Sequence, residues 1–207
     1  MSITLIIIII TVIASYSAWK RQDLAQKWIM NPYVVHQRNE YHRFLTSGFI
    51  HADQAHLFFN MFTFYFFGEM VEHIYGILFG EDLGKLLFVG LYLMGIIISS
   101  IPSYLKHKNN SWYNSLGASG GVAAIVFSSI LMNPTEKIYI YAIIGIPGFI
   151  AGALYVLYSV YQSKRMADNI NHDAHLFGAL FGVVFTLAIK PDVLPFFISQ
   201  ILSYRFF

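Results

Sequence analysis

Long apolar blocks alternate with short polar segments along the chain. Six blocks are long enough to predict helices across a bilayer, because a hydrocarbon core of ~30 Å takes ~20 helical residues to cross. These blocks are residues 3–19, 55–78, 83–101, 116–132, 138–161 and 173–190. Backbone polar groups in lipid must pair internally, and the alternation typical of a membrane barrel is missing. The pattern therefore predicts an all-α membrane protein with a bundle of six transmembrane helices.

Composition agrees with this interpretation. Of the 207 residues 57% are hydrophobic and 12% are charged, and the mean hydropathy of +0.57 is too high for a soluble domain of this size. We see no repeat or linker, so we expect one domain over residues 1–207. Its last segment, residues 191–207, is apolar but too short to span, and we expect an interfacial tail.

The first apolar block also resembles a signal peptide, which starts apolar and ends in small residues. It lacks a positively charged start, however, and it ends in Trp19, Lys20 and Arg21, which are typical of an interfacial anchor. We therefore expect a retained helix.

Charge and cysteine content exclude several classes of function. The net charge is only +2 and no basic run interleaves with aromatic residues, so we expect no nucleic-acid partner. The chain has no cysteine, which excludes disulfides and thiol chemistry. Acidic residues gather around the end of the second block, and we expect them to face solvent: Glu69, Glu72, Glu81 and Asp82.

The polar residues within the apolar blocks lie where alternating helices would bring them together. Helices that alternate in direction place the starts of the second, fourth and sixth on one side of the membrane. His56 and Asn60 open the second and share a face at i, i+4 spacing. Ser119 opens the fourth, and His175 opens the sixth. Polar groups at membrane depth usually face a bundle interior or a wet cavity, so these four predict a site.

Small residues favour close contact between the fourth and sixth helices. The fourth block covers only ~17 residues, or about 25 Å, so the polar loop 111–115 could carry water down to Ser119. The small residues, which we expect to pack these helices, are Gly117, Gly120, Gly121, Gly178 and Gly182. Alone, one serine among glycines is more typical of packing than of catalysis.

Together the four polar residues could carry out acyl transfer. A serine hydroxyl needs a base, and His175 could accept the proton of Ser119. His56, Asn60 and the backbone N–H of Ser119 could donate to an oxyanion. Asp173, two positions before His175, points to another helix face, so we expect a Ser–His pair without a third carboxylate.

At these residues the chain resembles the rhomboid intramembrane serine proteases. "HLFFN" corresponds to the family's HxxxN, "GASG" to its serine motif, and "AHLFG" with its GxxxG continuation to the last helix. The resemblance implies a rhomboid-like bundle with Ser119 as nucleophile, His175 as general base, and His56 and Asn60 on the oxyanion side. It also implies hydrolysis near the ends of transmembrane protein substrates within the lipid bilayer, without metal or cofactor. We expect a multi-pass protein of a bacterial cell membrane.

Two residues depart from the family pattern. His42 precedes Arg43 where many members have tryptophan, which affects how the first loop sits in lipid. Ala123 stands four positions after Ser119, where many members carry an aromatic residue that packs on the catalytic histidine. Another side chain must therefore hold His175, or activity is low.

The basic residues disagree with the family topology. That topology gives a cytoplasmic N-terminus and an active site facing outward, whereas Lys and Arg usually mark cytoplasmic loops. The outer loops would hold Lys20, Arg21, Lys27, Arg38, Arg43, Lys106, Lys108, Lys164 and Arg165. The inner loops would hold Lys85, Lys137, Lys190 and Arg205. The charges favour the opposite orientation, but the first loop is long enough to fold into the interface, and we follow the family.

Three other functions stay open. A zinc site could use His172, Asp173 and His175 with His51 or His56, although no HExxH motif occurs. A catalytically inactive relative that binds transmembrane segments would agree with the Ala123 departure. A transporter would need broken helices and repeat symmetry, and we see neither.

Overall fold

The structure is a computed structural model that describes residues 1–140, 143–165 and 171–205, and it is mostly helical. Within those ranges lie ten α-helices. Three are long and apolar enough to cross a membrane: α1 (Ile3–Lys20), α6 (Glu81–His107) and α9 (His172–Ile189). The other long helices are α5 (Gln54–Phe79), α7 (Ser119–Met132) and α8 (Gly148–Arg165).

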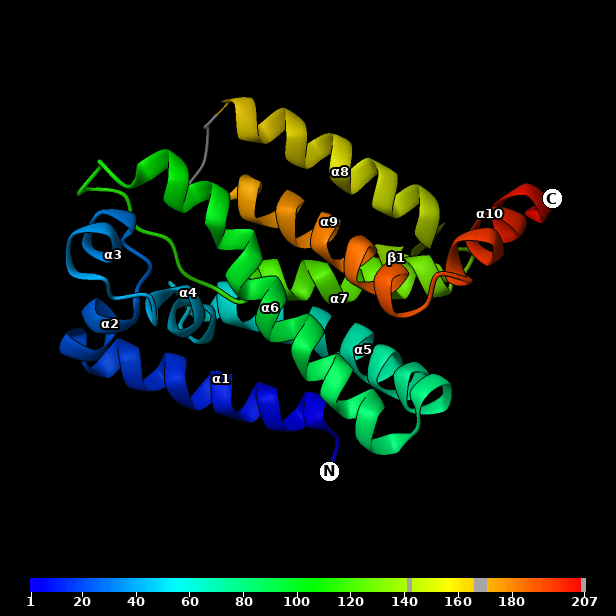
Figure 1. Ribbon diagram of the computed structural model, residues 1–207, viewed down its shortest axis with the longest axis horizontal. Helices are drawn as coiled ribbons and strands as arrows, with labels where there is room; N and C mark the ends of the chain where they lie inside the picture. The colour runs from blue at the N-terminus through cyan, green and yellow to red at the C-terminus, as the bar shows by residue number, and fades with distance from the viewer. Residues whose placement is uncertain (141–142, 166–170, 206–207) are drawn as a thin grey trace.

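Shorter elements connect the long helices. The segment between α1 and α5 contains α2 (Gln22–Trp28), α3 (Pro32–Arg38), α4 (Arg43–Thr46) and the 3₁₀ turn η1 (Ser47–Phe49). An antiparallel hairpin of β1 (Lys137–Ile140) and β2 (Ile144–Pro147) precedes α8, and α10 (Val193–Ser203) follows α9. The helices alternate in direction, so α5, α7 and α9 begin at the end that carries α2, α3 and α4 (Figure 1).

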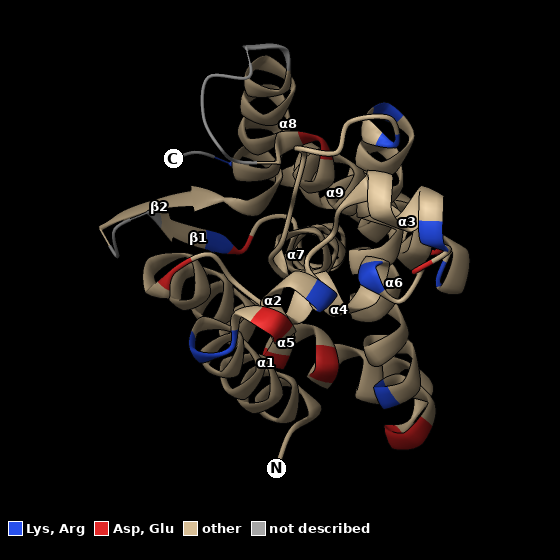
Figure 2. Ribbon diagram, turned by 90° about the vertical axis from the view of Figure 1, so that its left-hand side faces the viewer, with Lys and Arg blue, Asp and Glu red and all other residues tan. Residues whose placement is uncertain are grey.

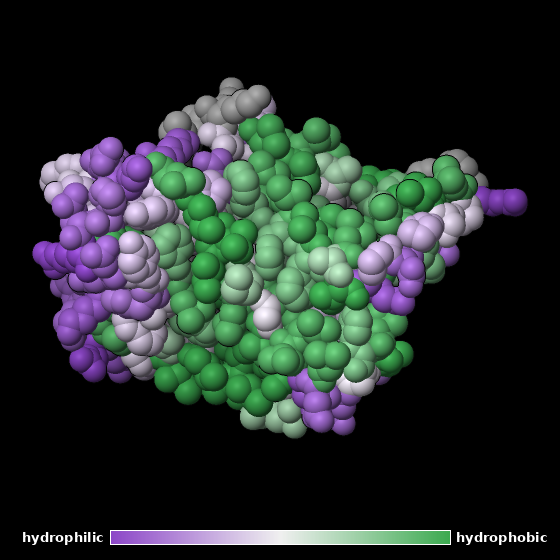
Figure 3. Space-filling model, viewed as in Figure 1, coloured by the Kyte–Doolittle hydropathy of each residue, from purple (hydrophilic) through white to green (hydrophobic). Residues whose placement is uncertain are grey.

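Helix α7 lies at the centre of the bundle. Viewed from the end that carries α2, α3 and α4, it is surrounded by the other long helices (Figure 2). It has no charged residue, and almost every side chain from Gly120 to Met132 is buried. A helix that is apolar on all sides belongs in such a position. On the face drawn in Figure 3, apolar side chains cover the middle of the molecule and hydrophilic ones gather at the α2–α4 end, as expected for a bundle in lipid.

The prediction of one helix over residues 138–161 is wrong at its start. Lys137–Ile140 and Ile144–Pro147 pair as β1 and β2, and α8 begins at Gly148. The run is rich in isoleucine and tyrosine, which suit strands as well as apolar helices. Pro147 has no N–H and pushes the residue before it toward extended backbone, so a helix could not pass through it undisturbed.

The fourth helix is shorter than predicted. It begins at Ser119 instead of residue 116, because Gly117 has a φ of +118° and cannot be helical. Its 14 residues correspond to about 21 Å of helix. The serine therefore stands at the first position of α7.

The prediction that Glu69 and Glu72 face solvent is also wrong. The Glu72 carboxylate accepts hydrogen bonds from the backbone N–H groups of Ile3 and Thr4, each at 2.8 Å, and from the Thr4 hydroxyl at 2.8 Å. The Ser2 hydroxyl donates to Glu69. The first N–H groups of a helix have no partner within the helix and carry partial positive charge. Glu72 therefore caps α1 from α5, and Glu69 bonds the N-cap residue Ser2.

A cluster of three hydroxyl groups joins the last turns of two helices and the end of a third, α5, α7 and α9. Tyr75 of α5 lies 3.0 Å from the Ser128 hydroxyl of α7, and the Thr186 hydroxyl of α9 lies 2.7 Å from the same oxygen. All three side chains are buried. Buried polar groups that bond one another fix how their helices sit side by side.

Helices α7 and α9 touch through their backbones. A Cβ added to Gly178 would overlap the carbonyl oxygen of Gly120, and one added to Gly182 would overlap the carbonyl oxygen of Ala124. Such contact needs glycine, because any side chain would force the helices apart. The Cβ position of Gly120 itself faces Ser99 of α6.

We expect Gly178→Ala to lower the melting temperature in detergent, because its methyl group must displace the α7 backbone at a cost of about 1–3 kcal/mol. Gly76→Ala on α5 is the matched control. A Cβ there meets nothing within 4 Å, and alanine is a better helix former by about 1 kcal/mol. Thermal unfolding of the two variants checks this. Equal melting temperatures would contradict the backbone contact.

Candidate active site

The start of α5 positions His56 and Asn60. The Asp53 carboxylate accepts the backbone N–H of His56 at 2.7 Å, and this N-cap fixes where the helix begins. Both side chains then share one face of α5, with Asn60 one turn deeper. The Asn60 side-chain amide donates to the carbonyl oxygen of His56 at 3.0 Å, so one of its two N–H groups is bonded within the helix.

The His56 ring lies against the backbone that leads into Ser119. A Cβ on Gly117 would lie 2.6 Å from Cε1 and 2.8 Å from Nε2 of His56, so only glycine fits there. The Gly117 N–H donates to the carbonyl oxygen of Ser47 at 2.9 Å. Gly117, which we expected to pack between helices, therefore admits the imidazole of α5 beside the serine segment.

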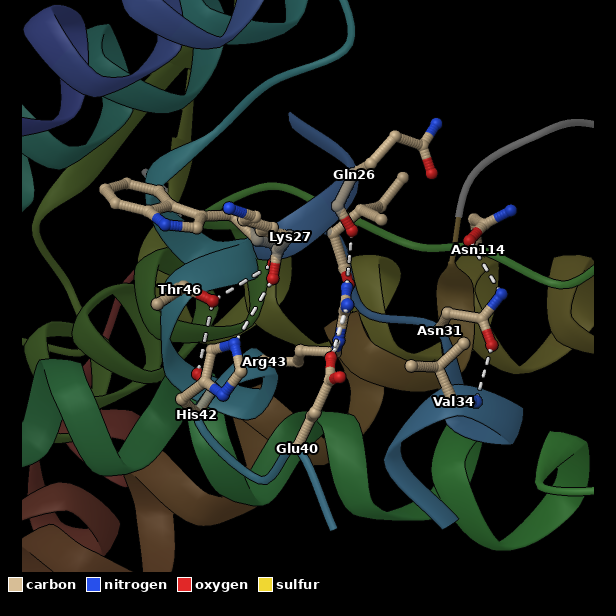
Figure 4. Close-up of polar contacts among 11 residues, drawn as sticks. Gln26, Lys27, Asn31, Val34, Glu40, His42, Arg43, Thr46 and Asn114 are labelled. Carbon is tan, nitrogen blue, oxygen red and sulfur yellow. Dashed lines mark hydrogen bonds and ion pairs between the residues drawn. The ribbon is translucent and has the colours of Figure 1, made fainter. Parts of the chain in front are cut away.

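The segment before α7 is tied to the first loop. Met30 and Ser115 form an antiparallel bridge, with N–H to carbonyl distances of 3.0 and 2.9 Å. Next to it, the Asn31 amide donates to the side chain of Asn114 at 3.1 Å (Figure 4). Met30 is fully buried. The backbone that carries Ser119 is thus held by residues more than 80 positions earlier in the sequence.

Arg43 holds the first loop itself together (Figure 4). Its Nε donates to the Glu40 carboxylate at 2.7 Å, and this contact lowers the pKa of the Glu40 carboxyl group. It also donates to two backbone carbonyls, at 2.7 and 2.8 Å, those of Gln26 and Ile29. The guanidinium is buried, as a charged group can be when it is paired and fully hydrogen-bonded. His42 lies with its ring nitrogen 3.2 Å from the carbonyl oxygen of Lys27.

His51 contacts the same segment from the loop before α5. The Ala118 N–H donates to its Nε2 at 3.2 Å, and a backbone amide can only donate, so Nε2 carries no hydrogen. The proton therefore resides on Nδ1, 3.0 Å from the Ser15 hydroxyl, which in turn donates to the carbonyl oxygen of Phe49. Burial lowers the pKa of His51 to about 3, which keeps the ring neutral.

The sequence had suggested His51 only as one candidate metal ligand. Its place in "FIHADQAH", five residues before His56, was the available signal. The structure assigns it instead to fixing the residue directly before Ser119.

His175 lies in the first turn of α9, which Asn171 caps by accepting the N–H of Ala174 at 3.1 Å. Its half-buried ring stacks on Tyr155 of α8, with centroids 6.2 Å apart and planes at 17°. The His175 ring also meets the edge of the His172 ring, with centroids 5.9 Å apart.

The backbone contact between α7 and α9 places the segments that carry Ser119 and His175 next to each other. Ser119 directly precedes Gly120, whose carbonyl oxygen touches Gly178, and His175 lies one turn before Gly178. His56 reaches the same segment through Gly117. The first turns of three helices therefore meet here, and the start of α7 presents backbone N–H groups beside the serine.

Asp173 belongs to a different set of contacts. Its carboxylate accepts from the Ser163 hydroxyl of α8 and lies 3.4 Å from the Lys106 ammonium of α6. In the part of the chain that the structure describes, no three histidine, aspartate or glutamate side chains converge as metal ligands. The alternative of a zinc site gains no support from this geometry.

Comparison with known proteins identifies the family of this chain. The Rhomboid domain family matches residues 38–191. The chain is 26% identical over 178 residues to RHOMBOID-like protein 12, mitochondrial, of Arabidopsis thaliana, covering 77% of this chain and 51% of that protein. It is 30% identical over 171 residues to Rhomboid-like protein 11, chloroplastic, of the same plant, covering 75% and 55%. It is 29% identical over 145 residues to human presenilin-associated rhomboid-like protein, mitochondrial, covering 67% and 35%.

The chain spans about half the length of the first two relatives. The matched family region contains every residue of the candidate site, from His56 to His175. It also contains α5 to α9, so family and fold agree over the same helices. The chain belongs to the rhomboid family.

Proposed function

We propose that the chain is an intramembrane serine endopeptidase that hydrolyses peptide bonds in or near transmembrane helices of membrane proteins. The observation that carries the proposal is the backbone contact of Gly120 with Gly178, which has Ser119 and His175 at its end. In this proposal residues 1–207 form one domain, α1 and α5 to α9 cross the bilayer, and α10 lies at its surface.

The Ser119–His175 pair performs the reaction in two steps. The Ser119 hydroxyl attacks the substrate carbonyl carbon while His175 takes its proton and then passes it to the leaving amine. Water hydrolyses the resulting ester with His175 again as the base. This sequence uses only side chains and water, so we expect no cofactor requirement.

The groups that stabilise the tetrahedral oxyanion come from two helices. The backbone N–H of Ser119 is at the start of α7, and the His56 ring lies against Gly117, two residues before that serine. The Asn60 amide carries a second N–H in addition to the one bonded to the His56 carbonyl. Donors fixed in advance at the developing charge are among the largest contributions to such catalysis.

The partners follow from the membrane context of the family. Substrates would be transmembrane proteins that reach the site from the lipid bilayer, since the helices expose many large apolar side chains. The named plant and human relatives are mitochondrial or chloroplastic. A bacterial cell membrane stays our prediction for this chain, as does the outward orientation of the site.

A catalytically inactive relative that binds transmembrane segments is the second candidate, and Ala123 is the observation in its favour. Assays of the purified protein in detergent distinguish the protease from the inactive relative. The proposal expects cleavage of a model transmembrane substrate, labelling by a fluorophosphonate, and no effect of a chelator. Binding of the substrate without cleavage or labelling would establish the inactive relative, and loss of activity that zinc restores would establish a metal enzyme.

We expect Asn60→Ala to lower kcat about 10- to 100-fold, because one oxyanion donor is lost while those of His56 and Ser119 remain. Asn60→Asp is the matched variant. It keeps the shape but places negative charge beside the oxyanion, so it should lose more. Steady-state cleavage in detergent measures both. An unchanged kcat in Asn60→Ala would show that Asn60 does not stabilise the oxyanion and has only a structural bond to the His56 carbonyl.

A further inference from the structure

We propose that Tyr155 of α8 is the positioning residue that orients the general base His175. The inference rests on the proposed function, because it assigns a role within the same site. It also answers the question that Ala123 raises, namely which ring holds the histidine when the fourth helix supplies none.

The first observation is the stack itself. The rings of Tyr155 and His175 are nearly parallel, at 17°, with centroids 6.2 Å apart, which is an offset stacked geometry. Tyr155 and His175 are both half-buried, so each ring is partly enclosed by the helices around it. An imidazole held on one side by a ring has fewer rotamers to explore than one facing water.

The second observation is the face of α7 that α8 covers. Ser119, Ala123 and Phe127 follow one another at i, i+4 and i+8, so they share a face. Phe127 meets the Tyr155 ring at 5.6 Å. Tyr155 therefore lies beside the face on which Ala123 contributes only a methyl group.

The third observation explains why α8 comes close enough. A Cβ on Gly152 would lie 3.5 Å from Phe127 and 3.2 Å from Ile130, so the small residue lets α8 approach α7. Tyr155 follows one turn later. Tyr158 follows another turn on, and its ring meets His172 at 5.7 Å. A stripe of aromatic side chains on α8 thus faces the two histidines of α9.

The function of Tyr155 would be geometric. Proton transfer requires His175 within hydrogen-bond reach of the Ser119 hydroxyl, and small misplacements of catalytic groups cost up to about 100-fold in rate. Losing the ring should therefore reduce turnover, whereas substrate binding, which depends on other surfaces, should change little.

The test compares Tyr155→Leu, Tyr155→Phe and Tyr161→Leu in the purified full chain. We expect Tyr155→Leu to lower kcat and the rate of fluorophosphonate labelling about 10- to 100-fold, with KM changed less than about twofold. Tyr155→Phe keeps the ring and should retain most of the turnover. Tyr161 is exposed on the same helix, so its leucine variant controls for a tyrosine change on α8.

Tyr155→Met, which fills the site with a flexible apolar chain but no ring, replaces Tyr155→Leu if that variant unfolds. A rescue variant completes the test. Ala123→Phe in the Tyr155→Leu background returns a ring from α7 and should recover part of the lost labelling rate. Melting temperatures establish that each variant is folded. Wild-type turnover in a folded Tyr155→Leu variant, or a loss in Tyr155→Phe equal to that in Tyr155→Leu, would overturn the inference. Wild-type protein that neither cleaves nor labels would instead overturn the proposed function.

Discussion

Ser119→Ala should abolish substrate cleavage and fluorophosphonate labelling while the bundle stays folded. Without the hydroxyl no acyl-enzyme can form, and loss of the nucleophile in serine hydrolases reduces kcat by a factor on the order of 10⁴ or more. Ser119 is half-buried at the first position of α7 and its side chain does not cap the helix. Alanine should therefore fold as well as serine there.

Cleavage of a model transmembrane substrate and gel fluorescence after labelling measure this effect. Ser100→Ala on α6 is the matched control, because its hydroxyl donates only to the Ile96 carbonyl of its own helix, at 3.0 Å. That variant should behave as the wild type. Cleavage that persists in Ser119→Ala would place the nucleophile elsewhere, and the proposed reaction would have to be abandoned.

His175→Ala should cause a loss of similar size, because the Ser119 hydroxyl then has no base and a neutral serine is a weak nucleophile. Labelling by the fluorophosphonate should also fail, since it needs the same activation. His73→Ala is the control, because His73 is exposed on α5, far along the helix from His56. The same cleavage and labelling assays apply.

The same experiment also tests the neighbouring histidine, His172, as an alternative general base. His172 is buried and its ring meets that of His175 at 5.9 Å. If His175→Ala retained activity and His172→Ala lost it, the role of the base would belong to His172. Loss in His175→Ala alone, with a normal melting temperature, would support the proposed assignment.

The helices could be predicted because apolar length is a strong signal. The direction of each helix follows from counting, which is why the first turns of α5, α7 and α9 could be expected at one end of the bundle. The hairpin before α8 could not be predicted. Its isoleucine-rich run suits a strand or a buried helix equally well, and only its packing decides between them.

The contacts between distant segments could not be predicted either. Glu72 caps α1 across 68 and 69 positions of sequence, and nothing near Glu72 identifies its partner. The stack of Tyr155 on His175 depends on the rotation and depth of α8, which hydropathy does not define. Motifs show which residue types are present. Which side chains meet depends on how far each helix is turned and shifted against the next.

The bridge between Met30 and Ser115 determines which residues a fragment must contain to keep the serine segment in place. The region that matches the family begins at residue 38, after both α1 and Met30. A recombinant fragment cut to that boundary would contain every proposed active-site residue, yet the strand partner of Ser115 would be missing. Chimeras that exchange the serine segment between relatives would need to carry the first loop along with it. The structural unit that holds the proposed active site thus extends beyond the residues that match the family.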